Sequence, residues 1–253
     1  MKKTFLTAAL ATLAAFFAGS AAMAQDAGPA FRPVEMWACK YKDRKDQDDL
    51  DRVYELEAQA SGGGGYSAWH LSPYMVGDRV EQFDFIYLGA WADGTTMGTG
   101  MAHYMANGQA AENAWDATLD CLGSMYASTR IQAVPAGSGD GSGGFVMTIS
   151  DCKVAEGSTA GQAIGALTRF NAYRVANGST VPTFAWFPVY GGGGAEFDFK
   201  LAHAYTDVEA LGSDFSWYVD HQAYNTYNQI TQGVVACDEA RLYMGKTIVS
   251  GMN

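Results

Sequence analysis

The stretch FDFIYLGAWADGTTMGTGMAHY, at residues 83–104, returns in altered form as FDFKLAHAYTDVEALGSDFSWY at residues 197–218. A shift of 114 positions aligns the two stretches without a gap and places Phe83-Asp84-Phe85 on Phe197-Asp198-Phe199. With small gaps, the match extends to Cys39 over Cys152 and Cys121 over Cys237. Self-similarity at a fixed spacing indicates that one structural unit has been duplicated.

The boundary between the two copies is also visible. Residues 135–144, PAGSGDGSGG, have the composition of a flexible linker. We therefore expect a first α+β repeat over residues 25–134 and a second over residues 145–253.

Both copies predict the same order of elements. The first predicts strand 34–41, helix 46–60, a hairpin of strands 66–76 and 82–92, a helical region over 95–122 that breaks at residues 107–108, and strand 126–134. The second predicts strand 145–152, helix 158–176 capped by Ser158, strands 181–190 and 196–205, a helical region over 208–232, and strand 241–249. The order βαββαβ is typical of the ferredoxin-like motif, in which helices cover one face of a four-stranded sheet and leave the other face bare.

Two such units on one chain can each cover the bare face of the other. The duplicated pattern therefore resembles the dimeric α+β-barrel superfamily in a fused, tandem form, as found in uncharacterised exported bacterial proteins. The resemblance implies an α+β fold of two ferredoxin-like repeats packed sheet to sheet as a pseudo-two-fold barrel. The superfamily includes monooxygenase-like, haem-degrading and chlorite-dismutase-like proteins, but function resides in sites rather than in folds.

The first 24 residues have the pattern of a secretory signal peptide. Lys2 and Lys3 precede an apolar run, and the small residues of Ala22-Met23-Ala24 precede Gln25. The apolar run is shorter than the roughly 20 residues of a membrane-spanning helix. We therefore expect a periplasmic or secreted protein with no membrane span.

The charge of the chain excludes one class of partner. The formal net charge of −11 becomes −13 without the two lysines of the leader. A strongly acidic surface repels phosphate backbones, so we expect no nucleic-acid partner. A fused pair already satisfies the interface that single units form, so we expect a monomer or a weak homo-oligomer.

Four cysteines in an exported chain should pair, and four allow three connectivities. The first and last strands of a ferredoxin-like sheet are antiparallel neighbours, which predicts Cys39 with Cys121 and Cys152 with Cys237. The chain contains no CxxC motif and no cysteine with a histidine at ligand spacing, so we expect no metal site.

Polar residues on the predicted strands are the first candidates for chemistry. Asp84 and Asp198 occur in both copies, each between two phenylalanines, where a carboxylate needs a partner. A structural hydrogen bond or salt bridge, with Arg79 or Lys200, is favoured over acid–base work. His70 and His203 are the histidines on predicted strands, and a haem site would use one of them as its axial ligand.

Aromatic residues form the second candidate. Because side chains alternate along a strand, Tyr87 and Trp91 share a face in the first copy, as His203 and Tyr205 do in the second. Trp69 and Trp186 are expected to join this face. Core packing is the simpler interpretation, but the same residues suit a pocket for an apolar or aromatic ligand.

These patterns favour a non-catalytic protein that binds a small apolar ligand or a protein partner. The predicted ligand-binding residues are Trp69, His70, Asp84, Tyr87, Trp91, Trp186, Asp198, His203 and Tyr205, with no catalytic residue and no cofactor. The alternative is a haem-dependent or cofactor-free oxidoreductase of the monooxygenase-like type.

Overall fold

The computed structural model describes residues 30–61, 64–77, 82–132, 144–191, 194 and 196–251. The predicted leader at residues 1–24 and residues 135–143 of the predicted linker lie outside this part of the chain. No helix within the described ranges has the length and apolar character needed to cross a membrane.

The elements follow the duplicated order. The first half contains β1 (Phe31–Tyr41), α1 (Gln47–Ala60), β2 (Tyr66–Met75), β3 (Phe85–Trp91), α2 (Gly94–Asn107), α3 (Gln109–Thr118) and β4 (Leu119–Gln132). The second contains β5 (Phe145–Val154), α4 (Ala160–Ala176), β6 (Thr183–Tyr190), β7 (Phe199–Tyr205), α5 (Val208–Asp220), α6 (Ala223–Thr231), β8 (Val235–Cys237) and β9 (Arg241–Val249).

Eight of the strands close into one antiparallel barrel. The order is β7-β6-β4-β1-β3-β2-β9-β5, and β5 pairs with β7 to complete the circle, while the short strand β8 pairs with the end of β5. The halves join along two edges, where Ser128 of β4 lies opposite Trp186 of β6 and His70 of β2 lies opposite Lys246 of β9. The predicted packing of sheet on sheet is thus a continuous barrel, because the edge strands of each half hydrogen-bond to the other half.

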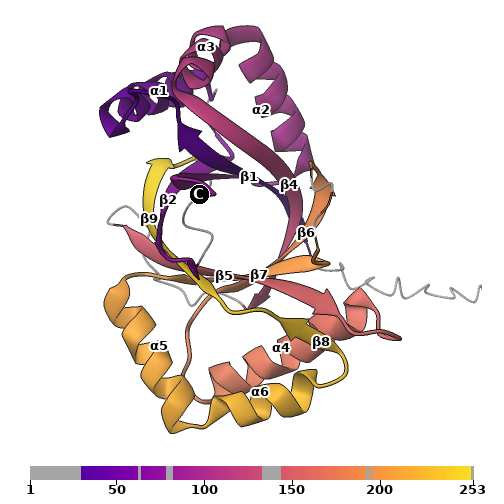
Figure 1. Ribbon diagram of the computed structural model, residues 1–253. Coiled ribbons are helices and arrows are strands. Elements are labelled where there is room, and N and C mark those ends of the chain that lie inside the picture. Colours follow the sequence, from indigo (N-terminus) through magenta and orange to yellow (C-terminus); the bar gives the residue numbers. More distant parts are fainter. Residues whose placement is uncertain are drawn as a thin grey trace, which may run out of the picture.

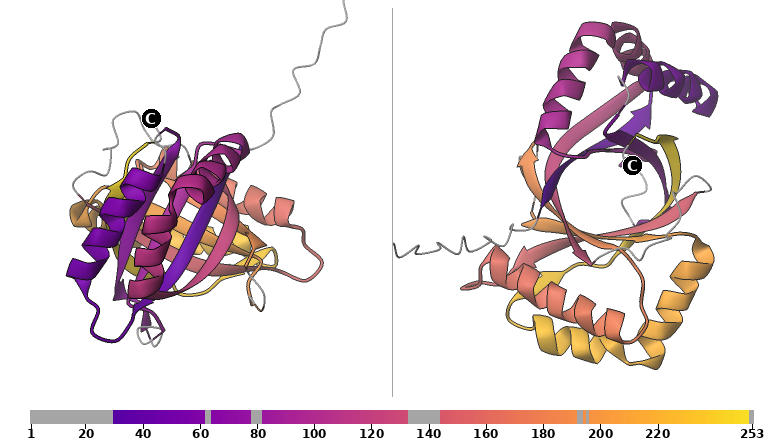
Figure 2. Two further views of the ribbon diagram at one scale, coloured as in Figure 1. Left: turned by 90° about the horizontal axis from the view of Figure 1, so that it is seen from above. Right: turned by 180° about the vertical axis from the view of Figure 1, so that it is seen from behind.

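Helices cover the barrel on two opposite sides. Figure 1 looks into the barrel and shows α1, α2 and α3 on one side, with α4, α5 and α6 across from them. The view from behind shows the same arrangement, and the view from above looks onto the first-half helices in front of the strands (Figure 2). The barrel is therefore the central layer between two helical layers.

The helices begin where the sequence supplies side-chain caps. Asp46, Asp93 and Asp207 each accept hydrogen bonds from the first-turn backbone of α1, α2 and α5. Thr159 and Gln162 form a capping box at α4, so the predicted cap at Ser158 is one residue too early. The second helix of the first half also ends earlier than predicted, because residues 119–125 pair with β1 and extend β4.

Buried side chains form cores on both sides of the barrel wall. The interior core draws on strands of both halves and contains no helical residue; it includes Leu71, Ile86, Met147, Trp186 and Tyr243. A second core lies between α1 and the first-half strands, with Leu50, Tyr54, Phe85 and Tyr87. A third lies between α4 and the second-half strands, with Leu167 and Phe199.

Candidate functional site

The structure divides the predicted aromatic set between the two faces of the barrel wall. Tyr87 and Trp91 do share a face, but that face lies under the helices and not inside the barrel. Tyr205 packs with Leu211 of α5 in the same way. Trp69 and Trp186 lie on the other face, in the interior core, so they do not join the aromatic set as predicted.

Asp84 and Asp198 have identical structural roles. Each directly precedes a strand, and its carboxylate accepts a backbone N–H across 2.8 Å from Tyr41 and 2.7 Å from Val154, respectively. Their own backbone N–H groups donate to the carbonyls of Cys39 and Cys152. The structure therefore provides backbone partners for both carboxylates, and the alternative partner Arg79 lies outside the described residues.

Lys200, the other partner considered for these carboxylates, belongs to a separate cluster. It alternates with the helix-facing Phe199 and Leu201, so it faces the barrel interior. Its Nζ lies 2.5 Å from Asp151 Oδ1 and 4.0 Å from the centre of the Phe197 ring. Arg241 completes the cluster with ion pairs to Asp151 and Asp238.

The predicted disulfides are confirmed. Cys39 bonds to Cys121 and Cys152 bonds to Cys237, and both pairs lie directly opposite each other in neighbouring strands.

A polar network missed by the sequence analysis lies between the first-half sheet and its helices. The Tyr66 hydroxyl donates to Oε1 of Glu35 across 2.7 Å and lies 2.8 Å from the Tyr87 hydroxyl. The indole N–H of Trp37 donates to Oε2 of Glu35. Burial raises the pKa of Glu35, although both hydrogen bonds lower it.

Gly89 makes room for this network. A Cβ at this position would lie 2.4 Å from Tyr66 Oη and 2.5 Å from Glu35 Oε1, too close for either atom to remain in place. The signal for Glu35 was present in the sequence, since it shares the strand face of Cys39 and Trp37 in β1. Its partners on β2 and β3 became visible only with the strand register.

A pocket of about 300 Å³ opens next to this network. One wall is the pair Tyr66 and Trp91, which are cross-strand neighbours with ring centroids 4.8 Å apart. The opposite wall is one face of α2, and the end of α1 closes the side. Its lining residues are Ser61, Gly64, Tyr66, Trp91, Thr95, Thr96, Thr99, Gly100 and His103.

The pocket wall is polar, and no Lys, Arg, Asp or Glu is among its described lining residues. The indole Nε1–H of Trp91 has no hydrogen-bond acceptor among the described residues, and a Cβ at Gly100 would lie 3.1 Å from it. Thr95 and Thr99 add hydroxyl groups, and His103 adds an imidazole. Trp91 is the only residue of the predicted site that lines this pocket.

His70 does not line the pocket, and both of its ring nitrogens have hydrogen-bonding partners. Its Nδ1 lies 2.7 Å from the Tyr54 hydroxyl, its Nε2 lies 3.0 Å from Ser72 Oγ, and its ring stacks on Phe85. Burial, with a smaller contribution from the Lys246 cation, lowers its pKa to about 4. His70 is therefore neutral and already bonded at both ring nitrogens.

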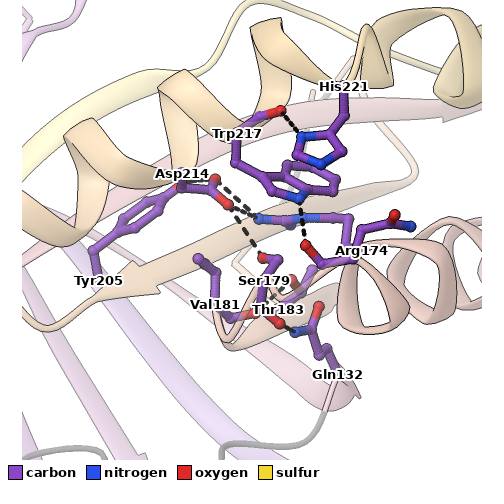
Figure 3. A network of polar contacts seen from close by, with 10 residues as sticks. Gln132, Arg174, Ser179, Val181, Thr183, Tyr205, Asp214, Trp217 and His221 are labelled. Carbon is purple, nitrogen blue, oxygen red and sulfur yellow. Dashed lines mark hydrogen bonds and ion pairs between the residues drawn. The ribbon is translucent and has the colours of Figure 1, made fainter.

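The corresponding region of the second half contains a buried ion pair. Figure 3 shows Arg174 of α4 reaching Asp214 of α5, with Nη2 2.8 and 2.9 Å from the two carboxylate oxygens. The hydroxyls of Ser179 and Tyr205 each donate to Asp214 across 3.2 Å. Trp217 packs on Arg174 and donates its indole N–H to the Asn177 carbonyl.

His203 lies on the same side of the barrel wall, close to this ion pair. Burial is the main reason that its pKa falls to about 3, and the nearby Arg174 cation lowers it further. Neither His203 beside this cation nor the doubly bonded His70 fits an axial haem ligand. Among the described residues, no group of three or more His, Cys, Asp or Glu is placed to hold a metal ion.

Comparisons with known proteins identify the fold. No family model and no curated protein sequence matches this chain. Among solved structures it is similar to a proposed monooxygenase from Fusobacterium nucleatum subsp. nucleatum, with 8% identity, a TM-score of 0.56, and coverage of 88% of this chain and 96% of that one. It is also similar to a proposed chlorite dismutase (9%, 0.51, 88% and 96%) and to an anthrone oxidase-like protein (11%, 0.50, 88% and 96%).

At these identities the likeness shows the fold alone, which is that of the dimeric α+β-barrel proteins. It also corrects one expectation. The prediction that no cofactor is involved is wrong as an inference about this fold, because its members include haem-binding chlorite dismutases.

Proposed function

We propose that this protein binds a compact, uncharged aromatic molecule in the pocket between α2 and the paired ends of β2 and β3. The observation that carries the proposal is the Trp91 indole N–H, which lies at the pocket wall beside Gly100 and has no hydrogen-bond acceptor among the residues that the structure describes. A volume of about 300 Å³ is at the lower end of the range for small-molecule sites. The rings of Tyr66 and Trp91 offer an apolar surface for a planar ligand.

The lining also favours a particular polarity. No Lys, Arg, Asp or Glu is among the pocket residues, so a charged ligand would lose its hydration without gaining a partner. An oxygen that accepts a hydrogen bond would satisfy the N–H of Trp91. An aromatic ketone or a phenol combines such an oxygen with a flat apolar ring system.

Binding can be tested by calorimetry with 1-tetralone, an aromatic ketone, and tetralin, its hydrocarbon analogue. If the Trp91 N–H bonds the ketone oxygen, tetralone binds about 5- to 10-fold more tightly, as one net hydrogen bond of about 1 kcal/mol predicts. Trp91→Phe should abolish that preference while leaving the ring contact. Trp186→Phe, in the barrel interior, is the matched control and should retain it.

A tetralone affinity that is absent contradicts the proposed ligand, and one that does not change in Trp91→Phe contradicts the proposed site.

Oxidation of the bound molecule is a second candidate function. The fold is shared with a proposed monooxygenase and an anthrone oxidase-like protein, and Glu35 places a buried carboxylate next to the pocket wall through Tyr66. Anthrone is a direct probe, since its oxidation by O₂ yields anthraquinone and water. Oxygen uptake above the uncatalysed rate, measured with and without added haem, would support this function, and no increase in either condition would exclude anthrone oxidation.

We further infer that the first 24 residues direct export and that the chain is a fused pair of ferredoxin-like units. The two disulfides support export, because such bonds persist in oxidising compartments. Mass spectrometry of the protein produced in a bacterial host tests it: a mature chain beginning at Gln25 is expected, and an intact Met1 in a periplasmic fraction would contradict it.

A further inference from the structure

The two copies place equivalent residues around the pocket and around the buried ion pair. Counted from the helix caps Asp93 and Asp207, Gly100 of α2 is equivalent to Asp214 of α5. By the same count His103 is equivalent to Trp217.

The first helix of each copy gives a further equivalence. Counted from the caps Asp46 and Thr159, Ser61 at the end of α1 is equivalent to Arg174 of α4. On the sheet, Trp91 and Tyr205 are the last residues of β3 and β7 and align in the duplicated stretch. Each pocket residue in these pairs is therefore equivalent to a residue of the ion-pair cluster in the second copy.

Two of these exchanges replace a small uncharged residue of the first copy by a larger charged residue in the second copy. Where the first copy has Ser61 and Gly100, the second has a guanidinium and a carboxylate in bidentate contact. The Arg174 side chain is 4% exposed and that of Asp214 is 14% exposed, so the pair fills the space between the helices and the sheet. Tyr205 donates to Asp214, whereas its equivalent Trp91 has no acceptor within the described part of the chain.

We propose that the duplicated site has been kept open in the N-terminal copy only, and that Gly100 and Ser61 determine this. The Arg174–Asp214 pair occupies in the C-terminal copy the place that the ligand takes in the N-terminal copy. The chain accordingly binds one ligand, not two. This inference rests on the proposed function for the ligand, but the equivalence of the two places can be tested without it.

The test uses calorimetry with 1-tetralone on the full-length protein with both disulfides formed. The wild type should bind one equivalent. Gly100→Asp should weaken binding by at least about 30-fold, and Gly98→Asp is the matched control. A Cβ at Gly98 has nothing within 4 Å and the residue does not line the pocket, so its affinity should stay within about 2-fold.

The converse change should open the second copy. Arg174→Ser combined with Asp214→Gly should raise the stoichiometry from one equivalent toward two. Because this double variant removes a buried ion pair and can lose stability, circular dichroism must first show a folded protein. If it does not fold, the experiment that places the ion pair in the first copy decides whether the two places are equivalent.

The transplant places the ion pair in the first copy. Gly100→Asp alone buries a carboxylate without a counter-charge and should lower the melting temperature, and adding Ser61→Arg should restore much of that loss while binding stays absent. Rescue by Ser61→Arg supports the equivalence even if no tetralone binds to the wild type, in which case only the proposed ligand is wrong. Binding of two equivalents by the wild type, undiminished binding by Gly100→Asp, or no rescue by Ser61→Arg would each overturn the inference.

Discussion

The hydroxyl of Tyr66 donates to the Glu35 carboxylate across 2.7 Å while the ring of Tyr66 forms part of the pocket wall. One side chain therefore connects the candidate ligand site with a buried acid. Because the same hydroxyl also lies 2.8 Å from Tyr87 Oη, two hydrogen-bonding partners position the Tyr66 ring at the pocket wall.

Removing this hydroxyl should destabilise the protein. Tyr66→Phe leaves the ring in place but deprives the buried Glu35 carboxylate of one of its two donors, at a cost of about 1–3 kcal/mol in the free energy of unfolding. Urea denaturation at pH 7.5 measures the loss. Tyr74→Phe is the control, because Tyr74 is 65% exposed and its substitution should cost under about 0.5 kcal/mol. Equal losses in both variants would show that the hydrogen bond to Glu35 carries no stability.

The buried His70 should make stability depend on pH. Its pKa in the folded protein is about 4, below the usual 6.5, so the unfolded chain binds the proton more readily. The contribution of neutral His70 to the free energy of unfolding is fully present above pH 6.5. It declines as the pH falls from 6.5 toward 4, by about 3 kcal/mol at most.

Glu57 opposes this trend, since burial raises its pKa to about 7 and its stabilising protonated form is lost as the pH rises. The comparison must therefore be made between variants. We expect the stability advantage of the wild type over His70→Gln to shrink steadily between pH 7 and pH 4.5 in chemical denaturation. A constant difference over that range would show that His70 does not titrate in the unfolding reaction.

The equivalent residues Asp84 and Asp198 should each stabilise the fold, and by similar amounts. Asp84→Ala and Asp198→Ala each remove a carboxylate that accepts a backbone N–H at a strand end, and each should cost about 1–3 kcal/mol. Thermal or urea unfolding measures this, and tetralone binding should be retained in both folded variants. Loss of binding in a folded Asp84→Ala protein would return Asp84 to the list of ligand-binding residues.

The two disulfides should contribute similar stability. They join residues 82 and 85 positions apart, and closing loops of that length stabilises the folded state by up to about 4 kcal/mol each. We expect Cys39→Ser/Cys121→Ser and Cys152→Ser/Cys237→Ser to lower the urea midpoint by comparable amounts. If neither double variant is less stable than the wild type, the loop-closure argument fails for this protein.

Much of the architecture follows from local patterns in the sequence. The repeat around Asp84 and Asp198 predicts two units with the same element order, and the helix starts predicted at residues 46 and 158 lie within one residue of the observed caps Asp46 and Thr159. The disulfide pairing followed because the first and last strands of such a unit are neighbours. These features depend on short-range periodicity and on chain connectivity, which a sequence displays directly.

The site depended on the tertiary structure. The period of two in a strand groups Tyr87 with Trp91 but does not say whether their face turns toward the barrel interior or toward the helices, and the packing of α1 decided that. Glu35 became a site residue only when the strand register brought Tyr66 to it. The open pocket beside Gly100 and the closed place around Asp214 arise from contacts between elements distant in the chain, which no local pattern records.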